Sequence, residues 1–565
     1  MKKKELKKYN ITQLILSLFI VIFINVIISY FPLRLDLTKE KRYTLSDATK
    51  NMLRNIDDVV LFKIYLEGDF PAGFKRLRNE TKEMLNQFRA YSKYVEYEFV
   101  NPTENADKKK LRSIYKQLMD RGLEPTNLQV KDKTGKTSQQ IIFPCALVSY
   151  KGQEMPLQLL KSQIGVNSEN VLNNSIQGLE YSFASVLKKL SSENKPLIGF
   201  IGGHGELSKI EIADFAYTLA EFYKVKKIDI RNQIKSLEGC AAIIIAQPDS
   251  IFDEKDKFII DQFIMKGGKT LWLIDPVFAS MDSLRNSDVT PALPIQMNIN
   301  DMLFKYGVKL NYNLILDLKA VPIPIVTGYI GKQPQQSLLP WFYFPLIMPT
   351  IDHPIVKNVN AIKAEFVSSI DTVAVKNVKK TILLATSKYS RIVACPSIIS
   401  LELMKAEPDY QLYNKPPQTV AVLLEGKFQS LYRNRLTPEI EQSSDINFKN
   451  ESVNTKMIIV SDGDMARNQI YNKDNQTFPY PLGYDKWTQQ TYGNKDFLLN
   501  SVNYLCDDDG MINIRSRELT LRLLDKTKIN EHGLYLKILN IIAPILLIVL
   551  FGLYRAFRRK KLYTT

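Results

Sequence analysis

The sequence predicts an α/β protein in which two or more α/β domains lie between two transmembrane helices. Strand-like apolar runs alternate with helical segments from about residue 57 to residue 510, as they do in α/β domains. A long apolar run near each end of the chain is flanked by basic residues, as membrane anchors are. The length of 565 residues and the hydrophobic content of 45% suit several folded domains with a membrane attachment.

The carboxyl-terminal run, 534–554, has the length and composition of a membrane-spanning helix. It carries no charge from Ile538 to Tyr554, and ~20 mostly apolar residues are enough to cross a bilayer as a helix. A cluster of cations follows, and such clusters stay on the cytoplasmic side: Arg555, Arg558, Arg559, Lys560 and Lys561. A buried helix of a soluble core is the alternative, but such a helix rarely ends in so many cations.

The amino-terminal run, 11–31, follows a basic decapeptide with five Lys and one Glu, a net charge of +4. A cleaved signal peptide would have an apolar region of ~7–15 residues with small residues at the cleavage site. This run is longer and ends in Ser-Tyr-Phe-Pro, so we expect an uncleaved helix. Both chain ends would then be cytoplasmic, and the bulk of the chain would lie in the periplasm, held at a bacterial inner membrane.

The net charge of +17 indicates membrane topology and not nucleic-acid binding. The two tails contribute +4 and +5, which leaves +8 for more than five hundred residues, with no internal basic cluster. The four cysteines are far apart and form no C-x-x-C, and the three histidines are scattered, so we expect no metal, no cofactor and no redox motif: Cys145, Cys240, Cys395, Cys506, His204, His353 and His532.

These observations divide the chain into eight expected segments. They are a cytoplasmic tail (1–10), a first transmembrane helix (11–31), a linker (32–56), a thioredoxin-like α/β domain (57–190), a second α/β domain (197–510) with an insertion at about 276–455, a juxtamembrane segment (511–533), a second transmembrane helix (534–554) and a cytoplasmic tail (555–565). Within the linker, Ser46 is expected to cap a helix. The amphipathic stretch 519–528 lies just ahead of the final span.

The first domain has a β-α-β-α-β-β order followed by a helix, which predicts a thioredoxin-like topology. Its expected elements are 59–66, 74–91, 95–100, 108–121, 128–131, 141–149, 155–160 and 171–190. The turn that enters the first helix, 67–73, holds no cysteine, so this domain is expected to be a scaffold without redox chemistry.

The second domain alternates strands and helices, which predicts a doubly wound parallel sheet. Its elements are expected at 197–201, 210–223, 224–230, 241–246, 253–266 and 270–274, then at 300–306, 308–318, 365–370, 381–386, 420–425, 457–460 and 495–505. The Pro-, Gly- and aromatic-rich stretch 320–354 is either an exposed apolar surface or a buried loop. Gly268-Lys269-Thr270 resembles the end of a phosphate-binding loop, but the first glycine is missing and the context is helix-to-strand, so we reject that motif.

Two glycine-containing turns at predicted strand ends are the candidate ligand sites. The first follows strand 197–201, where parallel sheets bind ligands, and its His and Glu could perform acid–base chemistry: Gly202, Gly203, His204, Gly205 and Glu206. A tight turn held by one polar histidine is the favoured alternative. The second turn contains Asp462 and Asp464, and two carboxylates can hold a divalent cation, although Asp and Gly at a strand end more often serve backbone geometry.

Six stretches give the chain a resemblance to the GldG family, the gliding-motility ABC-transporter accessory proteins of gliding Bacteroidetes. They are RLDLTKEKRYTLS (34–46), IGFIGGHGELS (198–208), IIVSDGDMARNQ (458–469), PLGYDKW (481–487), NKDFLLNSVNYLCDDDGMINIRSRE (494–518) and LRLLDK (521–526). Any one of them alone is weak, but together they span nearly the whole region between the anchors.

The resemblance implies a subunit that works beside an ABC permease and a cytoplasmic ATPase, is needed for gliding and is linked to protein secretion. It also implies a glutamine-amidotransferase-like fold for the second domain. Enzymes of that fold place a catalytic cysteine on a strand-to-helix elbow, whereas Cys240 precedes the expected strand 241–246. We therefore expect a non-enzymatic accessory subunit, with self-association left open. The alternatives are a periplasmic hydrolase or glycan-binding protein that uses the Gly202–Glu206 turn, and a cell-envelope scaffold without a transporter.

Overall fold

The computed structural model describes most of the chain and divides it into two compact units, Met1–Arg517 and Glu518–Thr565. Each unit is considered by itself below. The described residues are 3–30, 44–103, 108–131, 137–161, 163–192, 194–231, 233–285, 287–405, 407–507, 510–516 and 526–563. Most of the expected amphipathic stretch 519–528 lies outside them.

Both expected anchor regions are helical. In the second unit, α12 (Lys526–Tyr563) contains the segment Glu531–Arg558, which is long and apolar enough to cross a membrane, with a mean hydropathy of 2.5. Its backbone leaves helical values at His532, where a kink joins two helical stretches. In the first unit, α1 (Lys3–Tyr30) carries a shorter apolar stretch, Ile11–Val26. Together these helices indicate membrane anchoring.

The first α/β region is built on a four-stranded sheet of order β2-β1-β5-β6. β1 and β2 pair in parallel, and the other two pairs are antiparallel, so a β-α-β unit is followed by a hairpin as the sequence predicts. The elements of this region are α2 (Asp47–Arg54), β1 (Val60–Ile64), α3 (Ala72–Tyr91), β2 (Val95–Phe99), α4 (Lys108–Asp120), β3 (Thr126–Lys131), β4 (Thr137–Ile142), β5 (Cys145–Tyr150), β6 (Gln153–Gln158), α5 (Ser168–Gln177) and α6 (Leu179–Ser191).

Two local features of this region follow from single residues. The Ser46 hydroxyl accepts a hydrogen bond from the Thr49 amide at 3.2 Å, which confirms the predicted cap of α2. The prediction of one continuous strand at 141–149 is wrong, because Phe143-Pro144 separates β4 from β5. Proline has no amide hydrogen to give to a strand ladder, so a break there is favoured.

The second α/β region contains a seven-stranded sheet of order β19-β22-β23-β10-β9-β7-β8. The five strands from β23 to β8 are parallel. At one edge β22 runs antiparallel to β23, and β19 runs antiparallel to β22. The main elements are β7 (Leu197–Gly202), α7 (Ala213–Ala220), β8 (Lys224–Asp229), β9 (Cys240–Ala246), α8 (Glu254–Met265), β10 (Lys269–Leu273), α9 (Asn300–Tyr306), β19 (Val378–Ala385), β22 (Thr419–Gly426), β23 (Thr455–Val460) and α11 (Asn494–Leu505).

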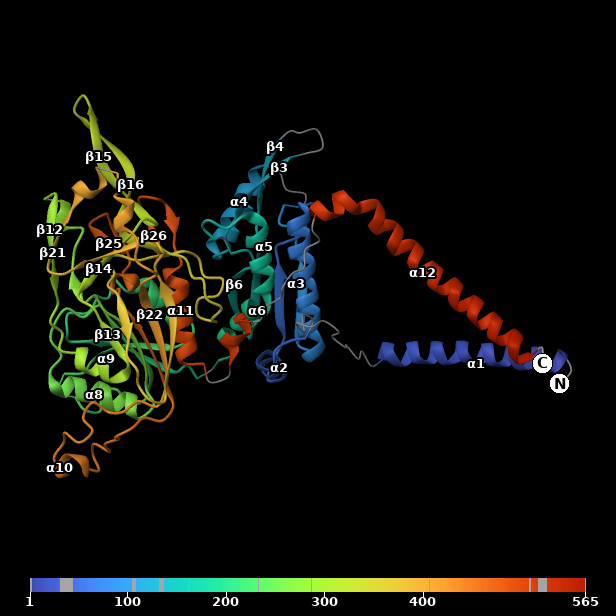
Figure 1. Ribbon diagram of the computed structural model, residues 1–565, viewed down its shortest axis with the longest axis horizontal. Coiled ribbons are helices and arrows are strands. Elements are labelled where there is room, and N and C mark those ends of the chain that lie inside the picture. The colour runs from blue at the N-terminus through green and yellow to red at the C-terminus, as the bar shows by residue number, and fades with distance from the viewer. Residues whose placement is uncertain are drawn as a thin grey trace. The chain divides into compact units, whose positions relative to one another are not determined.

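Helices cover this sheet on both faces, which makes three layers (Figure 1). On one face, α7 and α11 contribute Phe215, Phe497 and Val502 to a core that includes Ile244 of β9. On the other face, α8 and α9 pack Ile260 and similar side chains against the alternate residues of the same strands. Strands buried on both faces need continuous apolar sequence, which explains the AAIIIA run of β9.

The region 276–455 supplies β19 and β22 to the main sheet and also forms several small sheets. These are built from β11 (Val277–Phe278), β12 (Val289–Pro294), β13 (Val308–Leu310), β14 (Asn313–Asp317), β15 (Ala320–Ile330), β16 (Gln333–Ile347), β17 (Ile362–Lys363), β18 (Ile370–Thr372), β20 (Ser390–Ala394) and β21 (Ser397–Ser400). The helix α10 (Pro438–Glu441) lies between β22 and β23. After β23 come β24 (Ile470–Lys473), β25 (Gln476–Pro479), β26 (Tyr484–Asp485) and β27 (Gln490–Thr491).

Two expectations for this region need correction. The predicted strand at 365–370 is wrong, because residues 364–369 form no strand and only Ile370 belongs to one. Instead, the Ser368 amide donates to the Ser461 carbonyl at 3.3 Å, so contacts with the end of β23 replace a ladder. The stretch 320–354 is largely the β15–β16 hairpin, and its aromatic part is buried: Trp341, Phe342, Tyr343 and Phe344.

Candidate functional site

The carboxyl ends of four parallel strands meet around one cavity of about 480 Å³. Its lining includes Gly205 and Glu206 after β7, Gln247 after β9, Asp275 after β10, and Asp464 after β23. The chain runs outward from β7 to β8 and then returns to β9 on the other side of β7. Such a switch point leaves a crevice at the carboxyl ends of the strands, where open α/β sheets bind ligands.

The turn after β7 has a backbone that its glycines permit. Gly203 and Gly205 have φ values of 118° and 76°, a region that side chains with Cβ rarely adopt. A Cβ on Gly205 would lie 1.6 Å from Oδ1 of Asp249, so the two turns can approach this closely only with glycine there. The His204 carbonyl accepts hydrogen bonds from the amides of Asp249 and Ser250, which joins the turns after β7 and β9.

His204 is buried and is held on all sides. Its Nδ1 lies 3.2 Å from Oε1 of Glu206 and its Nε2 lies 2.9 Å from Oδ2 of Asp256. The imidazole also stacks on the Phe252 ring, with centroids 3.8 Å apart and planes 9° apart. Both ring nitrogens are therefore engaged, and His204 is not among the cavity-lining residues. This arrangement favours the interpretation of a histidine that holds the turn.

The charges around His204 stabilise its protonated form. Burial opposes the imidazolium, but the hydrogen bonds to Glu206 and Asp256 outweigh burial and raise the pKa of His204. For Glu206, burial acts to raise the pKa, yet the hydrogen bonds from His204 lower it overall. The imidazole therefore links two buried carboxylates, Glu206 and Asp256, in one compact group.

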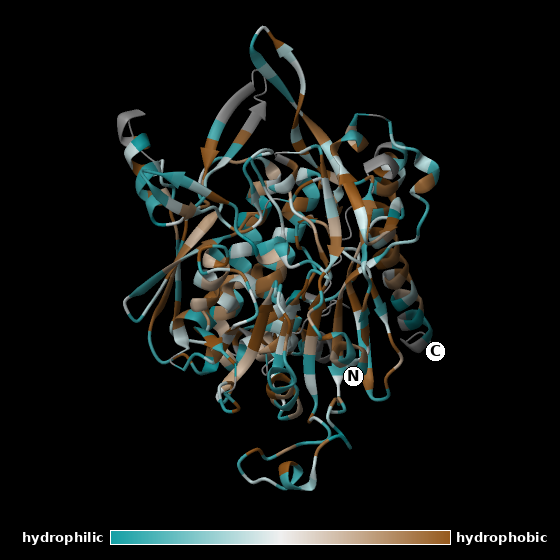
Figure 2. Cartoon of the chain, turned by 90° about the vertical axis from the view of Figure 1, so that its left-hand side faces the viewer, coloured by the Kyte–Doolittle hydropathy of each residue, from teal (hydrophilic) through white to brown (hydrophobic). Residues whose placement is uncertain are grey.

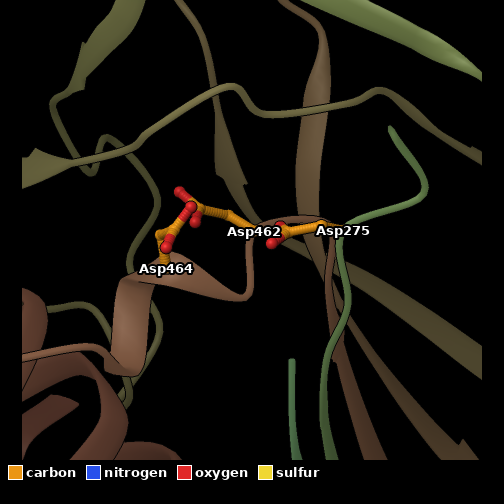
Figure 3. A group of neighbouring side chains, drawn as sticks. All are labelled: Asp275, Asp462 and Asp464. Carbon is orange, nitrogen blue, oxygen red and sulfur yellow. The ribbon is translucent and has the colours of Figure 1, made fainter. Parts of the chain in front are cut away.

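Three carboxylates from two strand ends form a second group beside the cavity (Figure 3). One oxygen from each of Asp275, Asp462 and Asp464 lies within 4.8 Å of the others. Asp462 is fully buried, and its two oxygens accept hydrogen bonds from the amides of Met465 at 3.0 Å and Glu365 at 2.9 Å. Asp275 accepts from the Gly463 amide at 2.5 Å and from the side chain of Gln247.

Burial and mutual repulsion hold protons on this group. Burial, with the negative charge of Asp275 added, raises the pKa of Asp464 to about 7. The same two causes raise the pKa of Asp462 well above its usual value, and burial raises that of Asp275. Arg467 reduces the repulsion, because its Nη1 lies 3.1 Å from Oδ1 of Asp464. Chemically, the three carboxylates could hold a divalent cation or share protons.

The structure thus brings the two candidate turns to one site. Glu206 and Asp464 both line the cavity, although 258 positions (464 minus 206) separate them in the sequence. Sequence reasoning missed several residues of the site: Glu211, Gln247, Asp275, Glu365 and Arg467. The sequence did contain a signal for Asp275, because Asp275 directly follows the buried run LWLI, much as Asp462 follows the run IIV after one serine. The other four residues had no such signal in the sequence.

The cysteines do not join this site. Cys240 is the first residue of β9, at the end of the strand opposite the cavity, so the expectation that it precedes the strand is wrong by one residue. A catalytic elbow would need a cysteine at the carboxyl end of a strand. Cys145 is buried, and the other three cysteines are half-buried.

Comparisons with known proteins match most of the chain. Residues 195–501 match the family described as "ABC-type uncharacterized transport system", and residues 39–149 match a family described as "Domain of unknown function (DUF7088)". A protein of Borreliella burgdorferi strain B31, described as "Uncharacterized protein", is 26% identical over 583 residues, which cover 99% of this chain and 100% of that protein.

One solved structure aligns weakly. It is described as "mmIFT52 N-terminal domain" and is 12% identical, over 55% of this chain and 98% of that one, with a TM-score of 0.31. A similarity this low carries no argument about the fold or the function.

Proposed function

This chain belongs to the auxiliary family described as "ABC-type uncharacterized transport system", and we propose that it is a non-enzymatic, membrane-anchored accessory subunit of an ABC transporter. The match over residues 195–501, more than half of the chain, carries the proposal. The matched residues include the second α/β region with the strand-end cavity, which supports a role for that region in transport. The proposed partners are an ABC permease and a cytoplasmic ATPase.

The two apolar helices support a specific topology. The segment Glu531–Arg558 can cross a membrane by length and composition, and α1 contributes the apolar stretch Ile11–Val26. Basic residues lie on the terminal side of each helix, and such residues favour the cytoplasm. In this proposal both chain ends are cytoplasmic, and residues from about 32 to 533 lie on the periplasmic side of the bacterial inner membrane.

The more specific role rests on the sequence resemblance alone. The six stretches shared with the gliding-motility accessory proteins support a transporter that serves gliding and protein secretion. The same resemblance supports an amidotransferase-like second domain, and the β-α-β unit with its hairpin supports a thioredoxin-like first domain.

We further propose that the cavity binds a ligand of the transport system. The turn after β7 and the turn after β23 line it together, at the switch point of the sheet. The residues involved are Gly202, Gly203, His204, Gly205, Glu206, Asp462 and Asp464. In this site, His204 shapes the turn, and the residues that face the cavity include Glu206 and Asp464.

The decisive experiment is purification of the full chain from native membranes in a mild detergent, followed by identification of the chains that co-purify. We expect one polytopic permease and one ATPase. An unrelated membrane protein with the same affinity tag is the control for non-specific capture. Recovery of the chain without permease and ATPase would refute the accessory role and would favour a scaffold that works without a transporter.

A further inference from the structure

The β15–β16 hairpin extends well beyond the small sheets that hold its base (Figure 1). Its strands pair from Ala320↔Pro345 at the base to Ile330↔Gln333 at the tip. The base is anchored by the buried aromatic residues of β16, whereas residues 329–338 are all exposed. A two-stranded ribbon without a packed face is only marginally stable in water. The exposed outer half of this hairpin therefore gains little stability from packing within the chain.

The tip carries two exposed, large apolar side chains directly before its turn. Tyr329 is 71% exposed and Ile330 is 66% exposed, and they lie directly before the turn at Gly331-Lys332. Hairpin turns favour Gly, Asn, Asp and Ser, and exposed large apolar residues are usually scattered. Figure 2 shows hydrophilic and hydrophobic stretches alternating along this ribbon up to its end. The apolar residues at the very end of the hairpin suit a contact made end-on.

The charge of the hairpin indicates the kind of surface that it contacts. No Asp or Glu occurs between Asp317 and Asp352, and the two charged residues in that interval are Lys319 and Lys332. Lys332 lies in the turn itself, next to the apolar pair. A Lys adjacent to Tyr and Ile matches an anionic bilayer surface, where the apolar side chains enter the interface and the ammonium stays among the headgroups.

We propose that this tip, residues 329–332, docks on a phospholipid bilayer with anionic headgroups. The inference rests on the membrane attachment that α12 indicates, because attachment keeps a bilayer at high effective concentration and a small contact then suffices. A second copy of the chain fits less well. Side-by-side pairing would use the length of the ribbon, but its two most exposed large apolar side chains, Tyr329 and Ile330, lie at its end, and Gln335 and Gln336 follow the turn.

The test uses the full chain with a Tyr329→Trp substitution, reconstituted in vesicles of phosphatidylcholine and phosphatidylglycerol in equal parts. The acyl chains carry bromine, which quenches tryptophan only at close range. Tyr410→Trp is the matched control, because Tyr410 is 66% exposed and follows Asp409. Emission of the native tryptophans is subtracted with the unsubstituted chain. We expect blue-shifted, quenched emission from position 329 and neither effect at position 410.

Charge is tested by adding Lys332→Glu to the Tyr329→Trp chain. One Lys near an anionic surface contributes a factor of about five, so the ratio of docked to undocked tips should fall at least about fivefold. Vesicles of phosphatidylcholine alone should weaken the quenching in the same way.

Each opposite result overturns a defined part of the inference. A chain that does not float with the vesicles contradicts the anchoring and the docking together. A chain that floats, with equal quenching at positions 329 and 410, contradicts only the docking. A blue shift at position 329 without bromine quenching would show a protein contact there and would exclude the bilayer.

Discussion

Nε2 of His204 lies 2.9 Å from Oδ2 of Asp256, and this contact joins the turn after β7 to the first turn of α8. The other oxygen of Asp256 is buried and has no hydrogen-bond partner within the described part of the chain. The carboxylate therefore depends on the imidazole for its charge balance, and the imidazole depends on the carboxylate to stay protonated.

Replacing His204 with Ala should destabilise the chain by about 3 kcal/mol, because two buried carboxylates lose their shared partner. His204→Gln should recover part of the loss, since an amide can still donate to one of them. Urea unfolding measures both. Tyr217→Ala, at a side chain that is 75% exposed, is the control and should change little.

The same position separates the accessory role from the hydrolase alternative. If His204 only shapes the turn, His204→Gln should keep the permease and ATPase in the purified complex and should keep cellular function. A hydrolase that uses His204 and Glu206 would lose function with His204→Gln at an unchanged protein level. Full function in the double variant His204→Ala, Glu206→Ala would exclude that enzyme.

Gly205→Ala should cost more than Gly152→Ala, although the two glycines have nearly the same φ, 76° and 77°. At Gly152 nothing lies within 4 Å of the added Cβ, so only backbone strain of about 1–3 kcal/mol applies. At Gly205 the Cβ would also collide with Asp249. The difference between the unfolding temperatures of the two variants therefore measures how closely the turns after β7 and β9 approach each other. Equal temperatures would contradict the close approach of Gly205 to Asp249.

Asp464→Asn should stabilise the chain at pH 8.5 and should stabilise it clearly less at pH 5. Asp464 has a pKa of about 7 in the folded chain and about 4 when unfolded, so the folded state binds more protons between these values. Stability contributed by this proton falls as the pH rises through that window. Thermal unfolding at both pH values measures the effect. Asp445→Asn, at a side chain that is 91% exposed, should show no such pH dependence.

Divalent cations should leave the thermal unfolding temperature unchanged. Both oxygens of Asp462 and both of Asp275 already accept hydrogen bonds, so few lone pairs face a cation. The measurement compares chelator, Mg²⁺ and Ca²⁺ at pH 7.5. A stabilisation that saturates with added cation, and that disappears in Asp464→Asn, would instead identify the three carboxylates as a cation site.

The strands around the cavity were predictable because they are buried on both faces. Continuous apolar runs marked β7, β9, β10 and β23 to within about two residues, and Asp253 marked the start of α8. Prediction failed where long-range contacts replaced local preference. The residues of β16 read as an irregular loop because Pro334, Pro340 and Pro345 interrupt them, yet pairing with β15 makes them a strand.

The sequence by itself determined which segments are apolar enough to be buried in a sheet or to enter a membrane, because this depends on the apolar character of consecutive residues. It also marked the turns at Gly202–Glu206 and at Asp462 and Asp464. Only the tertiary structure decided that these turns share one cavity. β23 pairs with β10 across more than 180 residues, as Thr270↔Met457 shows, and no local pattern records such a neighbour. The raised pKa of Asp464 arises in the same way, since burial and the charge of Asp275 exist only once the strands have assembled.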